Sequence, residues 1–348
     1  MSDDLVLVAN AGDSTVSSFA LDGSAHALRP MVTSPVGRGC STFVVDEERD
    51  LVYAATKGDD EGHGQGIDSF RLDRVTGALT RLGHVDGTGY HYLALAHGGT
   101  ILAGAAYHSG VATTWPLDRE GAIGEAAAQV EWQHAHAVAT VDDHLYVVSL
   151  GEDVIAQYAL ATDGTLESLD PPTATAPPGS GPRHIAVAAT GDHAYVVTEF
   201  SGVVLTYARD RRSGILEPVG SAHAHALDRG LGHSRLGADP VEEHLVWGAD
   251  IAIARDGSLV LASERCESTL ASIPIDADGV AEGPVVLMDT VAQPRGFAVS
   301  TDGRYAVVAG ELATEVQLVE ISGDGSMVDV GRAPTGRGAN WVRIIARS

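Results

Sequence analysis

The chain has 348 residues, of which 44% are apolar and 20% are charged, and its formal net charge is −25 at pH 7. A chain of this size and composition can bury a substantial hydrophobic core. Such a negative charge argues against nucleic acid and anionic membranes as partners, but a local group of arginines could still hold a small anion. Lys57 is the only lysine, so arginine carries almost all the positive charge.

The N-terminus and the cysteines bear on location. Residues 1–10 contain neither a basic segment nor a long apolar run, which predicts no signal peptide and no transmembrane helix. Cys40 and Cys266 lie far apart and show no metal-ligand spacing, so we interpret them as reduced thiols. Together these features predict a cytoplasmic protein.

One strand-like segment, rich in β-branched and aromatic residues, recurs seven times. The copies start at residues 5, 51, 100, 144, 193, 258 and 304, so most intervals are 44 to 49 residues and one is 65. In most repeats an apolar strand and a turn rich in Gly and Asp precede this segment, and two further strands follow it. Four strands per period, without helix-like periodicity, are typical of a propeller blade. The sequence therefore predicts an all-β, seven-bladed β-propeller.

The two chain ends are complementary in this scheme. The first repeat lacks a leading strand, whereas residues 340–345 (NWVRII) form an unassigned strand at the C-terminus. A C-terminal strand that pairs into the N-terminal blade closes the ring and leaves no open edge. We therefore predict one propeller domain over residues 1–348.

Two long loops interrupt the repeats. The interval of 65 residues contains a His-rich insertion at about residues 221–248, and a Gly-rich loop covers residues 57–66. Loops of this length without periodicity are often functional. His223 and His225 of the insertion either reach over the channel mouth as a lid or lie in solvent.

Polar residues gather at one end of the predicted axial strands, which we call the top. In a four-stranded blade, the loops that enter the first strand and those that leave the second share this face. Candidate residues for a ligand site at the mouth are therefore those at these points. Entering positions are His91, His134, His136, Arg183, His184, Asp250, Arg295 and Asn340; leaving positions are Lys57, Tyr107, Glu199, Glu264, Arg265 and Glu311.

The segment 179–207 is the most informative part of this set. Arg183 and His184 come just before the predicted strand at 185–188, and Glu199 follows the next strand. A hairpin reverses the chain, so the three side chains should meet at one end of a blade. His134 and His136 form a second pair, whose side chains would share one side if the strand extends that far. Such a pair could be half of a metal site, although no third or fourth ligand is evident.

Four segments together resemble the lactonase family of seven-bladed propellers, which includes bacterial 6-phosphogluconolactonases of the propeller type and the fungal 3-carboxy-cis,cis-muconate lactonising enzyme. The likeness covers the whole chain and is firmest over residues 134–311. The segments are GSGPRHIAVAATGDHAYVVTEFSGVVLTY, HAHAVATVDDHLYVVSLGEDVIAQY, GADIAIARDGSLVLASER and QPRGFAVSTDGRYAVVAGE.

The resemblance implies catalytic roles for a small set of mouth residues. Carried over by motif, these are His136 (or His134), Arg183, Glu199 and Arg265. Two positions depart from the family pattern, because Thr198 and Glu264 stand where the family has Asn. A carboxylate at Glu264 would partly offset the arginines that a phosphate ester requires. The remaining predicted substrate contacts are His134, His184, Asp250, Arg295 and His91.

The implied reaction is hydrolysis of a sugar lactone, with 6-phosphogluconolactone as one candidate. Glu199 or His136 would serve as general base, and Arg183 and Arg265 would polarise the carbonyl and hold an anionic substituent. No cofactor is expected. The alternatives are a lactonising reaction on a muconate-like carboxylate, a non-enzymatic propeller that binds a metabolite or protein, and a metal-dependent enzyme that uses His134 and His136.

Overall fold

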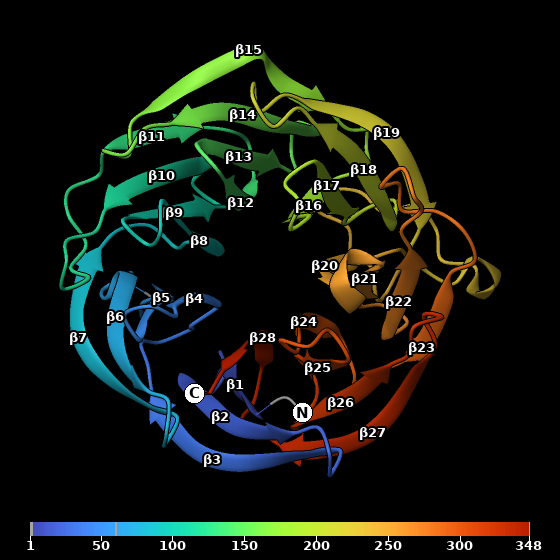
Figure 1. Cartoon of the computed structure of the whole chain (residues 1–348), viewed down its shortest axis with the longest axis horizontal. Coiled ribbons are helices and arrows are strands. Elements are labelled where there is room, and N and C mark those ends of the chain that lie inside the picture. Colours follow the sequence, from blue (N-terminus) through green and yellow to red (C-terminus); the bar gives the residue numbers. More distant parts are fainter. Residues whose placement is uncertain (1–2, 60, 348) are drawn as a thin grey trace.

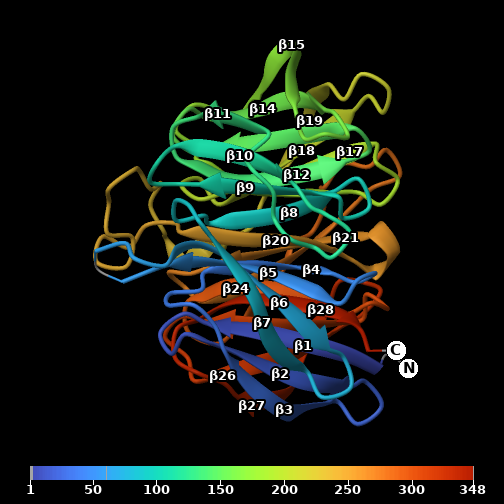
Figure 2. The same ribbon diagram turned by 90° about the vertical axis from the view of Figure 1, so that its left-hand side faces the viewer.

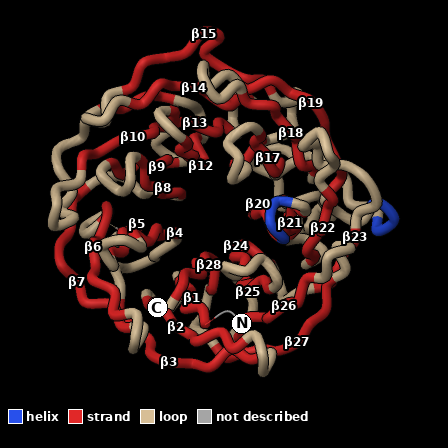
Figure 3. Tube along the Cα trace, viewed as in Figure 1, coloured by secondary structure: helices blue, strands red, loops and turns tan. Residues whose placement is uncertain are grey.

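The computed structural model describes residues 3–59 and 61–347. Seven four-stranded antiparallel sheets stand around a central axis, which confirms the predicted seven-bladed propeller (Figure 1). The only helices in the described residues are two short 3₁₀ turns, Leu227–Arg229 and Arg255–Gly257 (Figure 3).

Each blade runs from an axial strand to an outer strand. Blade 1 contains β28 (Ala339–Ala346), β1 (Asp3–Asn10), β2 (Thr15–Asp22) and β3 (Ala27–Pro35). Blade 2 contains β4 (Thr42–Asp46), β5 (Leu51–Lys57), β6 (Gln65–Asp73) and β7 (Ala78–Asp86). Blade 3 contains β8 (Tyr92–Ala96), β9 (Ile101–Ala106), β10 (Val111–Pro116) and β11 (Ala128–Glu131). Blade 4 contains β12 (Ala135–Val141), β13 (His144–Ser149), β14 (Val154–Leu160) and β15 (Leu166–Thr175).

The last three blades follow the same order. Blade 5 contains β16 (Pro182–Val187), β17 (His193–Thr198), β18 (Val203–Arg209) and β19 (Leu216–His223). Blade 6 contains β20 (Gly248–Ala254), β21 (Leu259–Glu264), β22 (Thr269–Pro274) and β23 (Val286–Asp289). Blade 7 contains β24 (Pro294–Val299), β25 (Tyr305–Gly310), β26 (Glu315–Ile321) and β27 (Met327–Pro334).

The ring closes as predicted, because β28 of the C-terminus pairs with β1 of the N-terminus. Leu5 stands opposite Ile345, and Val8 stands opposite Val342. Trp341 adds a link to the next blade, since its indole N–H donates to the carbonyl oxygen of Phe43 at 2.8 Å. Pairing at this seam removes the two free sheet edges that an open ring would expose.

The hydrophobic core lies between blades. Every cluster of buried apolar side chains draws its members from neighbouring sheets, as where Tyr146 and Val148 of β13 pack with Val196 of β17. Alternation along the strands produces this arrangement, because each blade is covered on both faces by its neighbours.

Tyrosine hydroxyls add polar links between blades. Tyr53, Tyr146, Tyr195 and Tyr305 each lie on the second strand of a blade and each donate to a glycine carbonyl in the outer turn of the next blade. The acceptors, in that order, are Gly121 at 2.9 Å, Gly214 at 2.6 Å, Gly279 at 2.9 Å and Gly23 at 2.8 Å.

Both long loops project from the same side of the ring, which is the top (Figure 2). The loop between β5 and β6 is blue in this view, and the loop between β19 and β20 is gold. The structure does not support the lid for the two histidines: His223 lies in the outermost strand of its blade, and buried His225 hydrogen-bonds the carbonyl of Gly202 at 3.0 Å.

Candidate functional site

Five of the seven axial strands have a β-bulge near their start, at the mouth of the channel. His136, Arg183, Arg295 and Asn340 are the extra residues of bulges in β12, β16, β24 and β28, where one more residue stands on the axial strand than on its partner. In β20 the bulge covers Ala249 and Asp250. Bulges commonly re-aim side chains beside functional sites.

The strand limits here correct the sequence prediction. Strand β16 begins at Pro182, so Arg183 and His184 belong to the strand and do not precede it. The pairing of β16 with β17 continues beyond the bulge to Pro182 and Thr198, and Arg183 is the extra residue of the bulge.

Three of these bulged residues, His136, Arg183 and Arg295, line a small cavity at the channel mouth. Ser41, His91, His136, Arg183, His184, Arg295 and Trp341 line it. Arg183 is 1% exposed and His184 2%, so the positive charge of Arg183 lies almost out of contact with solvent. A charge in such a place needs compensation from fixed partners.

Glu199 supplies that compensation for two arginines. Its Oε2 accepts hydrogen bonds from Arg183 Nε at 2.8 Å and from Arg265 Nη2 at 3.2 Å. Burial alone would raise the pKa of Glu199, but Arg265 and Arg183 outweigh it and hold the pKa below its usual value. Arg265 stacks its guanidinium 3.6 Å from the ring centre of Trp247. The cluster thus carries one negative and two positive charges.

His184 and Asp250 fix Arg183 from the other side. Asp250 Oδ1 lies 2.8 Å from His184 Nδ1, and Arg183 Nη1 lies 3.0 Å from His184 Nε2. A proton on Nδ1 satisfies Asp250 and leaves Nε2 to accept from Arg183. Burial, and then the charge of Arg183, lower the pKa of His184 to about 4, so this ring is neutral at pH 7.

The second oxygen of Asp250 is also occupied, because it accepts from the backbone N–H of Phe297 in blade 7 at 3.2 Å. Oδ1 additionally accepts from the N–H of Ile251 at 3.0 Å. Asp250 was predicted to contact substrate, but a buried carboxylate with both oxygens bonded orients its neighbours and does not face the cavity.

His136 presents an available nitrogen at the cavity. It is 5% exposed, and its Nδ1 has no hydrogen-bond partner among the described residues. Burial, and then the charge of Arg183, hold its pKa well below the usual value. His91 is similar, because burial and the charge of Lys57 lower its pKa to about 3. Both rings are therefore neutral at pH 7 and can accept a proton or hydrogen bond.

Arg295 and Glu311 complete the mouth on the blade 7 side. Arg295 Nη1 donates to Glu311 Oε1 at 2.9 Å, and each side chain is 25% exposed. Arg295 lines the cavity and Glu311 does not. Two of the residues that line the cavity are thus cations, Arg183 of blade 5 and Arg295 of blade 7.

Several predicted mouth residues have other surroundings. His134 is not part of the strand: it precedes β12 and has a positive φ of 52°, so the expected alternation with His136 fails. Its ring stacks on Tyr107 at 4.5 Å between centroids and lies outside the cavity lining. The ring of Tyr107, another predicted mouth residue, also meets those of His91 and His136.

Glu264 makes its hydrogen bonds outside the arginine cluster, although the charge of Arg265 partly opposes the rise that burial causes in the pKa of Glu264. Its carboxylate accepts from the backbone N–H groups of Trp247, Cys266 and Glu267 at 2.8 to 2.9 Å and so organises its own loop. Burial raises its pKa.

Ser41 and Trp341 line the cavity but were missing from the predicted set. Ser41 directly precedes the axial strand of blade 2, the position that supplies His91 in blade 3. A strict alignment of the seven repeats would have found it.

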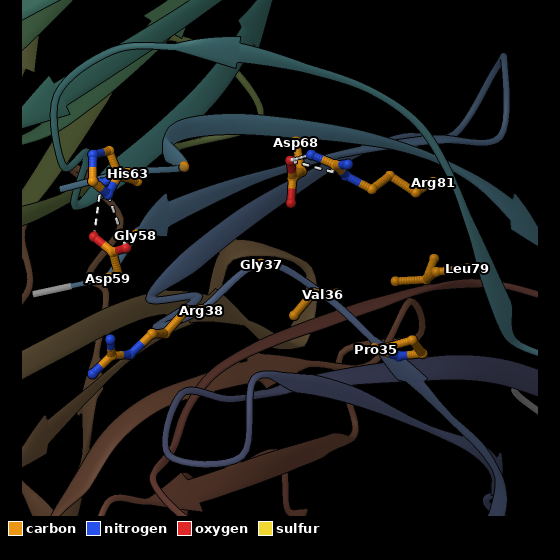
Figure 4. A pocket seen from close by; sticks show the side chains of 11 residues that line it. Pro35, Val36, Gly37, Arg38, Gly58, Asp59, His63, Asp68, Leu79 and Arg81 are labelled. Carbon is orange, nitrogen blue, oxygen red and sulfur yellow. Dashed lines mark hydrogen bonds and ion pairs between the residues drawn. The ribbon is translucent and has the colours of Figure 1, made fainter. Parts of the chain in front are cut away.

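A larger pocket lies elsewhere on the top face. It has a volume of about 510 Å³ and lies between blades 1 and 2, lined by residues such as Val36, Asp59 and Asp68 (Figure 4). Its charged groups are paired with one another: Asp68 with Arg81 at 2.7 Å and Asp59 with His63 at 3.1 Å. The cavity at the mouth has a volume of only about 10 Å³, which is room for about one water molecule, and it is the stronger candidate because the bulged residues His136, Arg183 and Arg295 converge on it.

No group of three or more His, Cys, Asp or Glu side chains is placed to hold a metal ion in residues 3–59 and 61–347. That the chain needs no cofactor stays a prediction. No helix in the same residues has the length and apolar character of a membrane crossing.

A ring of seven four-stranded blades with arginines and histidines at the mouth of its channel defines a β-propeller with a candidate ligand site on its axis. The family model described as "Lactonase, 7-bladed beta-propeller" matches residues 4–344, so the chain belongs to this family. The match spans nearly the whole chain, as the sequence resemblance predicted.

Named relatives agree with this assignment. A 6-phosphogluconolactonase of Sodalis glossinidius is 26% identical over 351 residues, which cover 99% of each chain. One of Klebsiella pneumoniae is 28% identical, over 92% of this chain and 88% of its own. Among solved structures, the periplasmic gluconolactonase of Pseudomonas aeruginosa has a TM-score of 0.84 at 21% identity, with 99% of each chain covered. A protein from Lactobacillus plantarum reaches 0.86 at 21% identity, covering 99% of this chain and 100% of its own.

Proposed function

We propose that this protein is a lactonase that hydrolyses a sugar lactone at the channel mouth. The observation that carries the proposal is the buried Arg183–Glu199–Arg265 cluster beside a cavity lined by neutral histidines. Membership of the lactonase family, with relatives named 6-phosphogluconolactonase over almost the whole chain, supports the same reaction.

In the proposed reaction, the guanidinium groups bind the lactone carbonyl. Arg183 lines the cavity, and its hydrogen bonds to described residues use only Nε and Nη1, which leaves Nη2 to donate to a ligand. Arg265 does not line the cavity and is linked to Arg183 through Glu199. Donors of this kind stabilise the negative charge that develops on the carbonyl oxygen as water attacks. Because Glu199, His184 and Trp247 already hold the two arginines, little reorganisation is needed.

The attacking water transfers a proton to His136 Nδ1 or to Glu199. A bond forms between the water oxygen and the carbonyl carbon, and the ester bond to the ring oxygen then breaks. The proton passes to the leaving alkoxide, which gives a hydroxy acid. Both candidate bases have lowered pKa values, so they are unprotonated at pH 7, although each is a weaker base than a group that titrates near pH 7.

The proposal includes a cytoplasmic location, which the two free cysteines, Cys40 and Cys266, support.

The test is to measure lactone hydrolysis by pH-stat with phosphorylated and unphosphorylated sugar lactones. We expect Glu199→Gln and Arg183→Ala each to lower turnover at least about tenfold while circular dichroism shows a retained fold. Glu120→Gln, in an exposed turn of blade 3, is the matched control and should keep the wild-type rate. Wild-type rates in both site variants would refute the assignment.

A further inference from the structure

The ring of His91 is held by the end of the neighbouring strand of blade 3. His91 directly precedes β8, and its backbone N–H donates to the carbonyl oxygen of Ala105 in β9 at 2.7 Å. Its ring nitrogen Nδ1 lies 3.3 Å from the backbone nitrogen of Tyr107, which directly follows β9. The rings of Tyr107 and His108 pack against the imidazole, with centroids at 5.8 and 5.2 Å. These contacts fix the orientation of the imidazole.

The contact with Tyr107 decides which nitrogen of His91 carries the proton. A backbone N–H can only donate, so Nδ1 presents its lone pair to the N–H of Tyr107. A neutral imidazole has one acceptor nitrogen and one N–H, and the proton is therefore on Nε2. A second proton on Nδ1 would oppose the N–H of Tyr107, which disfavours the charged ring. His91 thus has a donor, and no free acceptor, to offer a ligand.

This donor is available at the mouth cavity, which His91 lines together with Arg183. Nε2 of His91 makes no hydrogen bond with a described residue. It is also absent from the set of fully enclosed nitrogens without a partner, to which Nδ1 of His136 belongs. Nε2 therefore keeps access to open space, and it is the nitrogen through which His91 can bind a ligand.

The cavity has about the size of one oxygen atom. Its volume of about 10 Å³ admits about one water molecule, so it can take a single carbonyl oxygen of a ligand but not a sugar ring. Two donors reach it from different blades: Nη2 of Arg183 from blade 5 and Nε2–H of His91 from blade 3. Donors that are already in place are what an oxygen requires as it gains negative charge.

We infer that Nε2–H of His91 is a fixed hydrogen-bond donor to the carbonyl oxygen of the substrate, and that it stabilises this oxygen as water attacks. The inference rests on the proposed function, and it adds a neutral donor to the cationic donor Arg183. His91 keeps its proton throughout, because loss of Nε2–H from a neutral ring would leave an imidazolate. A neutral imidazole can polarise a carbonyl in this way, so His91 is distinct from the base that takes a proton from water.

Two substitutions separate the donor from the structural contact with Tyr107. His91→Asn can keep an acceptor for the N–H of Tyr107 but has no group at the position of Nε2, whereas His91→Gln can place an amide N–H near that position. In lactone hydrolysis followed by pH-stat, we expect kcat to fall about 100-fold in His91→Asn with little change in KM, as when one donor to an oxyanion is removed. His91→Gln should lose less than about tenfold.

His223→Asn is the control for these variants, because His223 is an exposed residue of the outermost strand of blade 5. It should keep the wild-type kcat. Wild-type turnover in His91→Asn, or an equal loss of turnover in both His91 variants, would overturn the donor role.

A second measurement locates the proton and needs no activity. In nitrogen-15 NMR spectra of the wild type at pH 7, the histidine signals that are absent from His91→Asn should show a protonated Nε2 and an unprotonated Nδ1. A proton on Nδ1 would overturn the inference. If the wild type hydrolyses no sugar lactone, the proposed function fails, while the spectra still decide whether His91 presents a fixed donor at the cavity.

Discussion

Among single residues, Arg183 shows how a buried charge becomes useful at this mouth. Its guanidinium has fixed partners on two sides, Glu199 and His184, and a further bond to the carbonyl of Ala249 at 2.5 Å. Removing one partner of a buried ion pair usually costs more than the pair contributes, because a charge is left without compensation. We therefore expect residues that only hold Arg183 to affect the reaction as well.

Asp250→Asn tests this expectation at a residue that holds Arg183 only through His184. Both Asp250 oxygens accept N–H groups, so an amide places its NH₂ against a donor in either orientation. When the NH₂ faces His184, the ring proton moves to Nε2 and opposes Arg183. We expect kcat/KM to fall at least about tenfold, as when a buried carboxylate that orients a histidine is replaced elsewhere.

Nitrogen-15 NMR of the histidine ring distinguishes this effect from a general loss of structure. The wild type should show the Nδ1-protonated form of His184, and the variant should show increased Nε2–H. Asp163→Asn, in an exposed turn, is the control. An Nε2-protonated His184 in the wild type would contradict the positioning role.

The residues of the site were predictable from the sequence only in part. Arg183, His184, Glu199 and Arg265 were placed together because a hairpin and the repeat fix which end of a blade each occupies. The partner of each ionisable group was not predictable. Glu264 and Asp250 are both acidic residues near the mouth, but only the folded backbone reveals which N–H groups they accept.

Among elements, the link between neighbouring blades combines apolar packing with a tyrosine hydroxyl. Tyr195 donates only to Gly279 O, whereas Tyr146 donates to Gly214 O and also accepts from the buried Arg209 Nε at 2.7 Å. The two residues occupy equivalent positions in adjacent blades, which makes them a matched pair.

We expect Tyr195→Phe to lower the free energy of unfolding by about 1 kcal/mol and Tyr146→Phe to lower it by more. The second variant removes two hydrogen bonds and leaves a guanidinium N–H of a fully buried side chain without a partner. Urea unfolding of the two variants provides the comparison. Equal losses would show that the bond from Arg209 contributes nothing to stability.

Strand positions followed from the period of the sequence, but the bulges did not. A bulge inserts one residue without changing the apolar pattern that identifies the strand. The HAHAVAT segment illustrates this: alternation from His134 to His136 was the natural expectation, yet the strand begins at Ala135 and His136 is the bulged residue. The bulges matter for function because they turn His136, Arg183 and Arg295 toward the cavity.

For the whole molecule, ring closure was predictable because the count of strands left one element missing at the start and one unassigned at the end. Closure also gathers charge, since residues from every blade meet at one mouth.

Two opposing effects of pH on stability follow from this. The net charge of −25 favours expansion at neutral pH, and protonation of exposed histidines reduces that repulsion as the pH falls.

The buried histidines act in the opposite direction. The pKa of His184 is about 4 and that of His91 about 3 in the folded protein, against about 6.5 in an unfolded chain. Between these values and pH 6.5 the unfolded state binds more protons, so stability falls as the pH falls. Each such histidine costs up to about 1.4 kcal/mol per pH unit in this window. Glu199 and Asp250, whose pKa values are lowered, lose their contribution only at still lower pH.

Salt separates the repulsion between exposed charges from the protonation of the buried histidines. At about 1 M salt the Debye length is about 3 Å, so repulsion between exposed charges is screened, whereas buried groups are little affected. We therefore expect the free energy of unfolding in 1 M NaCl to decrease steadily from pH 7 to pH 5, with a weaker decrease at low salt. His91→Gln should reduce the slope by removing one of the titrating groups. If the free energy of unfolding instead stays constant from pH 7 to pH 5 at high salt, the mouth histidines are protonated as easily as histidines in solvent. The neutral histidines on which the proposed chemistry depends would then not exist.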